Sequence, residues 1–396
     1  MRLWLLLLVV AAPADALAAP YAVGVSDVTF VDADRDGRSV PTDLYYPAAR
    51  AGTDVPVAGT DGERFPLVVL GHGYQIDADR YGWVGTRLAA SGFVVAAPRT
   101  ASELFPSHEQ FGLDLAFVVH ALRAEGDDPQ SPFAHRIATT AAVAGHSMGG
   151  GASFLAAASD ASITAVVNFA AAETDPSAIA ACGQLVRQVL MFVATDDCIT
   201  PPADHQIPMF QALLEGDRTL VSIDGASHCQ FAESSFLCEL GEFCSPSISR
   251  TEQHDLTWFL LEPWLRGILR DEHDQRALFQ GRLEELAGIS FLQAGIPVDV
   301  PVAPDRAPRL RVAPNPFNPT TEIRFVLTSA DRVQLDVFAV DGRRVRSLVS
   351  GSRSAGLHIV TWDGRDDNGR SLASDTYRIR LRAGDQERSR AVTLLK

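Results

Sequence analysis

The sequence predicts two folded units, a mostly parallel α/β sheet flanked by helices and then a small all-β sandwich. Three observations predict these fold classes. Short apolar runs alternate with segments of helical period from Tyr21 to about Gly295, a proline-rich segment follows, and the remaining chain alternates apolar and polar residues. A chain of 396 residues, 46% of them hydrophobic, is long enough to bury two cores.

The N-terminal segment, residues 1–18, has the pattern of a secretory signal peptide. Arg2 precedes an apolar run, Leu3–Ala12, and small residues follow, so we expect cleavage after Ala18. A membrane anchor is the alternative, but it needs about 20 apolar residues and this run is half as long. No later stretch of the sequence is long and apolar enough to span a bilayer. We therefore expect an exported protein without a transmembrane segment.

The first unit, residues 19–296, repeats a strand–helix–strand pattern. Apolar runs bounded by turn residues are typical of strands buried on both faces, and the repeated units favour a mainly parallel sheet. Apolar residues recur with helical spacing over residues 251–286, which predicts one or two helices with Trp258 and Trp264 on the buried side. Buried strands are expected at 65–70, 93–97, 141–144, 166–169, 189–193 and 219–223, and a long helix at 111–123.

An acidic segment near the start, Asp32–Gly37, imitates the beginning of a calcium-binding loop, with Asp43 at the twelfth position. It lies between two predicted strands, 23–31 and 39–45, and has no flanking helices. We therefore interpret it as a hairpin turn, and we expect the protein to use no metal and no cofactor.

The second unit follows a proline-rich segment, residues 297–313, which has no helical period and is typical of a stiff linker. From Asp305 to Lys396 the balance of charge turns positive, although the whole chain carries −15. Apolar and polar residues alternate over 322–327, 333–338 and 377–382, with glycine-containing turns between these segments. Several short alternating strands in one region predict a small β-sandwich.

The motif Gly145-His146-Ser147-Met148-Gly149 is the first indication of chemistry. It follows a predicted buried strand and opens a helix, and a serine between two glycines at such a turn forms a nucleophile elbow. The small neighbours allow the tight turn, and the positive end of the helix faces the hydroxyl. We therefore predict that Ser147 is a nucleophile.

A serine hydroxyl needs a base and an orienting acid, and candidates for both follow Ser147 along the chain. Asp196 and Asp197 stand on the loop after the strand at 189–193, and His228 stands on the loop after the strand at 219–223. We prefer Asp197 as the acid because of the proline four residues later, with Asp196 as the alternative. The other histidines that we interpret as surface or structural residues are His120, His135, His254, His273 and His358.

Two backbone N–H groups are needed to bind the oxyanion of a tetrahedral intermediate. Met148 opens the helix after the nucleophile and supplies one of them, and Tyr74, at the end of the turn that begins at Gly71, supplies the other. An ordinary glycine turn is the alternative interpretation of that segment. We expect the substrate site to be lined by Tyr74, Gln75, His146 and Phe169.

Five cysteines in an exported chain favour disulfides. Cys198 directly follows the predicted acid and Cys229 directly follows the predicted base, so contact between acid and base would bring these two cysteines within bridging distance. This predicts the pairs Cys198–Cys229 and Cys238–Cys244, with Cys229–Cys238 as the competing pair. Cys182 is left over, and we expect it to be free and buried.

These motifs resemble the α/β-hydrolase superfamily. Within it they are most similar to bacterial cutinases and poly(ethylene terephthalate) hydrolases, with dienelactone hydrolases and platelet-activating-factor acetylhydrolases as nearby relatives. The resemblance covers roughly residues 40–230. The matching stretches are Leu44–Pro47, Gly73–Tyr74, Trp83–Val95, His146–Gly151, Asp197 with Pro201, and Gly225–His228.

This resemblance implies the same nucleophile, base, acid and oxyanion amides as those proposed above from the residues. The chain departs from the polyester hydrolases at one place, because it has Ala172 and Glu173 where they carry an aromatic clamp, usually Trp. It also continues far beyond His228, with further cysteines and helices.

The C-terminal part resembles the FlgD-type Ig-like module found as a type IX secretion sorting domain. The resemblance implies export from, or surface attachment to, a Gram-negative bacterium, with the secretion machinery as partner and no role in catalysis. The matching residues are Pro314–Thr321, Asp341–Arg343, Leu348, Gly356 and Trp362–Gly364.

These features predict a secreted serine carboxylic-ester hydrolase that forms an acyl-enzyme on hydrophobic esters, including polyesters such as poly(ethylene terephthalate). A lipase, a short-chain esterase, an acetylhydrolase and an amidase are alternatives within the enzyme class. The alternative of another class is a non-catalytic, surface-attached binding protein on a hydrolase scaffold, which would need a broken triad or a filled pocket. The net charge of −15 argues against a nucleic-acid partner, and we expect a monomer.

Overall fold

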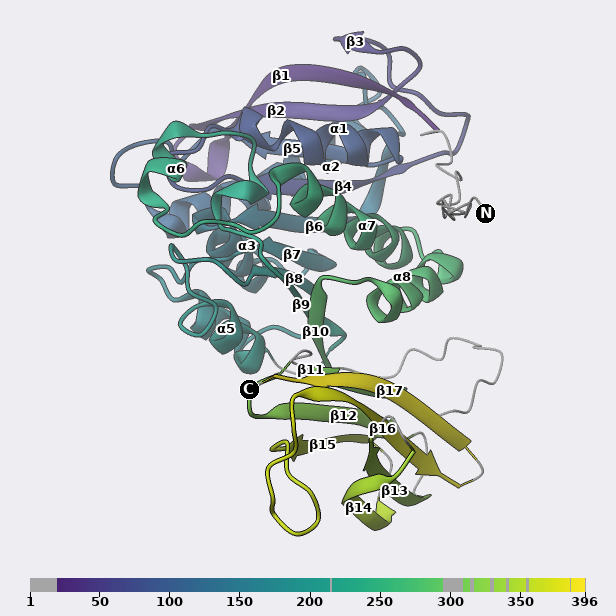
Figure 1. The fold of residues 1–396 in the computed structure, drawn as a ribbon. Helices are drawn as coiled ribbons and strands as arrows, with labels where there is room; N and C mark the ends of the chain where they lie inside the picture. The colour runs from purple at the N-terminus through teal and green to yellow at the C-terminus, as the bar shows by residue number, and fades with distance from the viewer. Residues whose placement is uncertain are drawn as a thin grey trace, which may run out of the picture. The chain divides into compact units, whose positions relative to one another are not determined.

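The computed structural model describes residues 20–213, 216–294, 309–313, 317–327, 331–339, 342–353, 356–384 and 386–395 (Figure 1). The chain divides into two compact units, residues 1–300 and 301–396. The predicted signal peptide and the predicted linker up to residue 308 lie outside the described residues.

The first unit is built on one sheet in which ten described strands follow the order β10-β9-β8-β7-β6-β4-β5-β2-β1-β3. The strands from β4 to β9 pair in parallel, whereas β1, β2 and β10 pair antiparallel at the two sides (Figure 1). This confirms the predicted α/β class. The strands are β1 Ala22–Asp32, β2 Arg38–Ala48, β3 Gly52–Thr53, β4 Phe65–Gly71, β5 Val94–Pro98, β6 Ile137–His146, β7 Ala165–Phe169, β8 Gln188–Ala194, β9 Arg218–Ile223 and β10 Ile289–Ala294.

Helices cover both faces of this sheet. Side chains along a strand alternate between the faces, so Leu67 and Val69 of β4 pack in one core with α2 and α3, while Val68 and Leu70 pack in a second core with α1, α7 and α8. Burial on both faces explains why the central strands are almost continuously apolar. The helices are α1 Gly82–Ala90, α2 His108–Asp127, α3 Met148–Ser159, α4 Ala178–Cys182, α5 Gln206–Ala212, α6 Phe236–Gly241, α7 Arg250–Leu269 and α8 His273–Glu285.

The segment predicted as one or two helices forms two, α7 and α8. They are separated at Asp271, whose φ of 57° lies in the left-handed region and cannot continue a right-handed helix. Trp264 is buried as predicted, whereas Trp258 is only partly buried. No helix among the described residues has both the length and the apolar character needed to cross a membrane.

The acidic segment Asp32–Gly37 joins β1 to β2, as the hairpin interpretation predicts. The Asp32 carboxylate accepts a hydrogen bond from the backbone N–H of Asp34 and pairs with Arg35, so the turn satisfies it internally. Asp43, at the twelfth position, lies within β2 and pairs with Arg99 at 3.0 Å.

The second unit consists of two antiparallel sheets around one core, which confirms the predicted all-β class. The described strands form the orders β11-β12-β15 and β14-β13-β16-β17. The core includes Phe317, Trp362 and Tyr377, with the tryptophan ring packed between the other two. The strands are β11 Arg309–Ala313, β12 Thr321–Leu327, β13 Asp331–Phe338, β14 Arg344–Arg353, β15 Gly356–Trp362, β16 Asp375–Ala383 and β17 Gln386–Leu394.

The predicted linker, residues 297–313, extends too far. Its last five residues form β11, which pairs antiparallel with β12, and Leu310 is buried in the core. Apolar residues alternate at 310 and 312, and this short strand pattern was obscured by the surrounding prolines.

Candidate active site

Ser147 occupies a sharp turn between β6 and α3. Its φ of 54° and ψ of −119° are unusual for a residue with a side chain, and such conformations concentrate at functional sites. The turn is held by the backbone, because the Ser147 N–H donates to Phe169 O at 3.0 Å and the Ser147 carbonyl accepts from Ala172 N–H at 2.8 Å. Only 8% of Ser147 is exposed, so neighbouring residues cover most of it.

Two glycines around Ser147 are required by close backbone approaches. A Cβ added at Gly145 would overlap the backbone of Gly149, and a Cβ at Gly149 would overlap the backbone of Gly71 at the end of β4. The elbow is therefore packed directly against the strand that leads to the predicted oxyanion turn. This is the physical reason for small residues on both sides of Ser147.

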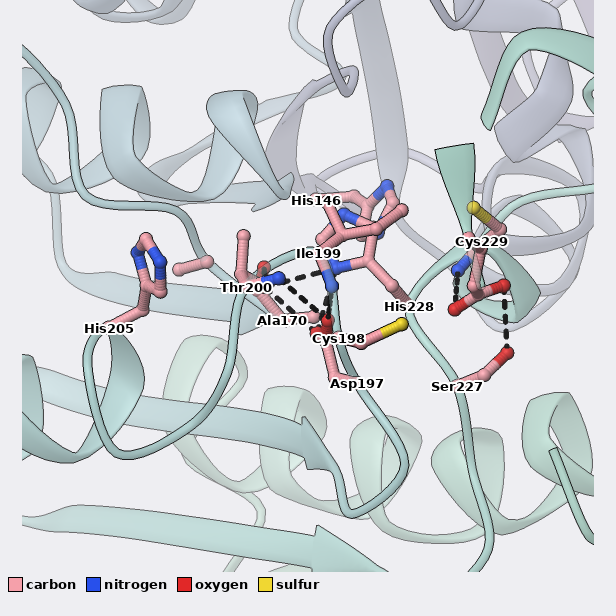
Figure 2. A network of polar contacts seen from close by, with 12 residues as sticks. His146, Ala170, Asp197, Cys198, Ile199, Thr200, His205, Ser227, His228 and Cys229 are labelled. Atoms are coloured by element: carbon pink, nitrogen blue, oxygen red, sulfur yellow. Dashed lines mark hydrogen bonds and ion pairs between the residues drawn. The ribbon is translucent and has the colours of Figure 1, made fainter. Parts of the chain in front are cut away.

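Asp197 and His228 meet at the carboxyl ends of β8 and β9. His228 Nδ1 lies 2.8 Å from Asp197 Oδ2, and both side chains are buried (Figure 2). A carboxylate only accepts hydrogen bonds, so Nδ1 carries a proton and the Nε2 of the neutral ring is free to accept one. Asp196, the alternative acid, is half-buried and takes no part in this contact.

The Asp197 carboxylate is fixed from within its own loop. Its Oδ1 accepts the backbone N–H groups of Ile199 at 2.9 Å and Thr200 at 2.7 Å. On the other side, Gln253 of α7 holds Ser227 by both backbone groups, at 3.0 and 2.9 Å, and so fixes the loop that carries His228. Hydrogen bonds within the two loops therefore hold Asp197 and His228 in position for their contact.

His146 does not line the substrate site, contrary to the sequence-based expectation. It is fully buried, its ring centroid lies 4.6 Å from that of His228, and its Nδ1 accepts from the Tyr81 hydroxyl at 2.7 Å. Burial and the neighbouring His228 lower the pKa of His146 well below its ordinary value, so the ring stays neutral. His146 is the last residue of β6, and its ring contacts those of Tyr81, His228 and Phe231.

Phe169 is the second correction. The last residue of β7, it is only 1% exposed and its ring packs against Phe192 and Phe231 at centroid distances of 5.7 and 5.8 Å. The backbone of Phe169 does contact the elbow, since its carbonyl accepts the Ser147 N–H. Its side chain points into the core instead of lining the substrate site, because residues along a strand alternate between the two faces of the sheet.

The turn after β4 carries the predicted oxyanion residue Tyr74. The N–H of Gly73 donates to the Tyr81 hydroxyl at 2.9 Å, which leaves the hydroxyl proton for His146 and links the turn to the elbow. Burial raises the pKa of Tyr81 far above its ordinary value, so the hydroxyl remains protonated. Sequence reasoning missed Tyr81, because no local pattern places its hydroxyl between two distant loops.

Tyr74 and Gln75 lie at the surface beside this turn. The Tyr74 hydroxyl donates to Leu104 O at 2.8 Å, and Gln75 Nε2 donates to the carbonyls of Ser102 and Glu103. Tyr74 is 46% exposed, and Leu104 is exposed as well. These contacts connect the turn to the loop after β5. Met148, which carries the other predicted oxyanion amide, is the first residue of α3, where N–H groups have no partner within the helix.

The preferred disulfide pairs, Cys198–Cys229 and Cys238–Cys244, are wrong, whereas the competing pair Cys229–Cys238 is confirmed. Cys198 bonds to Cys244 and Cys229 bonds to Cys238, with Cα separations of 6.0 and 5.8 Å. The prediction failed because adjacency to a contacting pair does not fix side-chain direction: Cys198 is exposed on its loop, whereas Cys229 is buried. Cys182 is free and buried, as predicted.

Both bridges join the α6 segment, residues 236–244, to the residue directly after Asp197 or His228. Glu242 of the same segment accepts from the Ser227 hydroxyl at 3.2 Å and from the Cys229 N–H at 3.3 Å. Burial raises the pKa of Glu242. The segment is thus attached to the loop that carries Asp197 and to the loop that carries His228.

Replacing Cys198 and Cys244 by serine is expected to lower the free energy of unfolding by roughly 2–4 kcal/mol, since the bridge joins residues 46 positions apart. The Cys229–Cys238 bridge spans only nine positions and is expected to contribute less. Urea unfolding of the two double variants measures this. Cys182→Ala, which breaks no bridge, is the control for cysteine removal, and equal unfolding midpoints for wild type and the Cys198/Cys244 variant would contradict the prediction.

Comparison with known proteins decides the family of the chain. Residues 15–250 match the family model described as PET hydrolase-like, which is more than half of the chain. The chain belongs to the PET hydrolase-like family. Within it, the chain is 28% identical over 215 residues to the Bis(hydroxyethyl) terephthalate hydrolase of Streptomyces coelicolor, covering 54% of this chain and 62% of that protein. It is 26% identical over 277 residues to Cutinase est1 of Thermobifida alba, covering 67% of this chain and 89% of the cutinase.

The second unit has a separate similarity. Residues 317–387 match the FlgD Ig-like domain model. A stretch of 56 residues is 38% identical to the basal-body rod modification protein FlgD of Salmonella typhimurium, covering 14% of this chain and 24% of that protein. The α/β unit of this PET hydrolase-like protein is thus followed by an Ig-like domain of a different family.

Proposed function

We propose that the protein hydrolyses carboxylic esters through an acyl-enzyme, with Ser147 as nucleophile, His228 as base and Asp197 as the acid that orients His228. The single observation that carries the proposal is the buried 2.8 Å contact between Asp197 and His228 at the sheet edge where the Ser147 elbow stands. Membership of the PET hydrolase-like family supports the reaction class.

The reaction would proceed in two halves. The Ser147 hydroxyl attacks the ester carbonyl carbon while His228 Nε2 takes its proton, and the resulting oxyanion accepts hydrogen bonds from the Met148 and Tyr74 N–H groups. The intermediate then expels the alcohol, which receives the proton from His228. Water attacks the acyl-enzyme with His228 again as base, and the acid leaves as Ser147 regains its proton.

The electrostatic surroundings support this division of roles. His146, the ring beside His228, is kept neutral by burial, so no fixed positive charge opposes the imidazolium that forms during attack. The buried Asp197 carboxylate faces Nδ1 and stabilises that imidazolium.

We propose hydrophobic esters as substrates, including polyesters. Tyr74, Leu104 and Phe105 are exposed on the loops beside the predicted oxyanion turn, and Phe105 is 88% exposed. Apolar side chains at a site favour apolar acyl or alcohol groups. The names of the two relatives, a terephthalate ester hydrolase and a cutinase, support the same class of substrate.

A substrate panel tests the proposal with the full chain. We expect hydrolysis of p-nitrophenyl butyrate, and release of terephthalate esters from a poly(ethylene terephthalate) film faster than release of fatty acid from a triglyceride emulsion. The opposite order would assign a lipase, and hydrolysis of a matched p-nitroanilide would assign an amidase. If the protein hydrolysed none of these substrates, the proposal of an ester hydrolase would be contradicted.

We propose that the protein is exported and that the C-terminal domain addresses it to a secretion system. The signal-peptide pattern of residues 1–18 and the two disulfides support export, since disulfides persist in oxidising compartments. To test this role, cells that express the full chain and cells that express a chain ending at residue 300 are fractionated, and the exported share of each chain is measured. Equal export of both chains would leave the domain without this role.

A further inference from the structure

Thr200 lies directly behind the contact between Asp197 and His228. Its hydroxyl oxygen is 2.8 Å from Asp197 Oδ2 and 3.0 Å from His228 Nδ1, so these three atoms form a small triangle (Figure 2). Thr200 is only 3% exposed, and its hydroxyl is closed off from solvent. The two half-reactions described above give this hydroxyl no part.

Gln206 of α5 determines which way the Thr200 hydroxyl can point. Gln206 is fully buried, and its Nε2 lies 3.1 Å from Thr200 Oγ1, 3.3 Å from Thr200 O and 2.6 Å from Ala171 O. An amide nitrogen only donates, so Thr200 Oγ1 accepts from Gln206 and must give its own proton elsewhere. Asp197 Oδ2 at 2.8 Å is a nearer acceptor than Ala170 O at 3.2 Å.

Thr200 and Gln206 also connect the loop that carries Asp197 to residues 170–172, the segment that supports the Ser147 turn. Thr200 reaches Ala170 O and Gln206 reaches Ala171 O, while the next residue, Ala172, donates its N–H to the carbonyl of Ser147. Residues 170–172 therefore lie between the elbow and the acid loop, and hydrogen bonds hold them from both sides.

We propose that Thr200 and Gln206 are positioning residues that hold the Asp197 carboxylate in line with His228 Nδ1. The inference rests on the proposed function and extends it to a chain of donors running from Gln206 through Thr200 to Asp197. When His228 takes the proton of Ser147, its Nδ1–H remains between Asp197 Oδ2 and Thr200 Oγ1, so the ring cannot rotate away from the acid. The chain of donors acts on the chemical step and leaves substrate binding alone.

Thr200→Val tests this, because valine keeps the shape of threonine and removes the hydroxyl. We expect kcat for p-nitrophenyl butyrate to fall roughly tenfold, as for loss of one hydrogen bond to a charged group, with KM changed by less than about twofold. Thr200→Ser, which restores the hydroxyl, is expected to recover kcat to within about threefold of wild type. The matched control is Thr42→Val in β2, a fully buried threonine whose hydroxyl donates to Val40 O, and it should keep wild-type kcat.

A double-variant cycle separates positioning from packing. If Thr200 acts through Asp197, Thr200→Val added to Asp197→Asn should lower kcat by less than about twofold further, because the acceptor it holds is already lost. A full tenfold further loss would overturn the proposal. So would an unchanged kcat in Thr200→Val, or a Thr200→Ser variant as slow as Thr200→Val.

A second measurement keeps the test decisive if Thr200→Val folds poorly. The low-field proton resonance of His228 Nδ1–H in the full chain should move in Thr200→Ala, which lacks the hydroxyl, and remain in place in Thr200→Ser and Thr42→Val. An unmoved resonance in Thr200→Ala would overturn the proposal. The proposed function fails separately: it fails when the wild-type protein hydrolyses no ester, whereas the positioning role fails when wild type and Thr200→Val hydrolyse esters equally.

Discussion

Replacing Ser147 by alanine is expected to lower kcat for ester hydrolysis by roughly a million-fold. Without the hydroxyl no acyl-enzyme forms, and only slow attack by water remains at a site that still binds substrate and oxyanion. The measurement is the initial rate on p-nitrophenyl butyrate, together with the melting temperature. Because the strained Ser147 backbone would persist with alanine, we expect the fold and KM to be retained.

A matched control shows whether the loss belongs to position 147. Ser159→Ala removes a serine hydroxyl from the other end of α3, where it donates to Ala156 O, and is expected to keep full activity. Equal loss in both variants would point to damage of α3 and not to a missing nucleophile. Retained activity in Ser147→Ala would remove the acyl-enzyme mechanism.

The parts of the site that follow from strand order could be predicted from sequence. Parallel strands end at one edge of a sheet, so loops after β6, β8 and β9 must come together there, and the chain order of serine, aspartate and histidine needs only local patterns to be recognised. The apolar runs that define these strands are long enough to identify, and their positions differ from the structure by only a few residues at each end.

Side-chain direction was harder to predict. Cys198 and Cys229 follow contacting residues, yet each bonds to a cysteine of the α6 segment because their side chains leave the two loops differently. His146 and Phe169 are near Ser147 in sequence or in space, yet both point into the core. Proximity in sequence shows where the backbone of a residue lies. Whether the residue can contact a substrate depends on the direction of its side chain, which the sequence does not show.

The contributions of Thr200 and Tyr81 depend on distances between loops. Thr200 stands three residues after Asp197, a spacing at which an aspartate commonly accepts a backbone N–H, and that spacing is the one signal the sequence offers. Nothing in the sequence brings Tyr81 to His146, because the two residues are 65 positions apart and meet only through the tertiary fold. Gln206 is only six positions after Thr200, but their contact depends on how the chain turns from the loop after β8 into α5.

Asp197→Asn is expected to lower kcat by roughly ten-thousand-fold with little change in KM. The hydrogen bonds around the carboxylate give the reason. Oδ1 accepts two backbone N–H groups, from Ile199 and Thr200, so that position must remain an oxygen in asparagine. The amide nitrogen therefore takes the place of Oδ2, where it faces His228 Nδ1 and donates to it.

A donor facing Nδ1 reverses the tautomer of His228. Nδ1 must then accept, the ring proton moves to Nε2, and Nε2 can no longer take a proton from Ser147. Asp196→Asn is the matched control, since Asp196 is the adjacent half-buried carboxylate outside the His228 contact, and we expect it to keep wild-type kcat within about twofold. If Asp196→Asn inactivated the enzyme and Asp197→Asn did not, Asp196 would be the acid that orients His228. The hydrogen bonds around Asp197 would then only stabilise its loop.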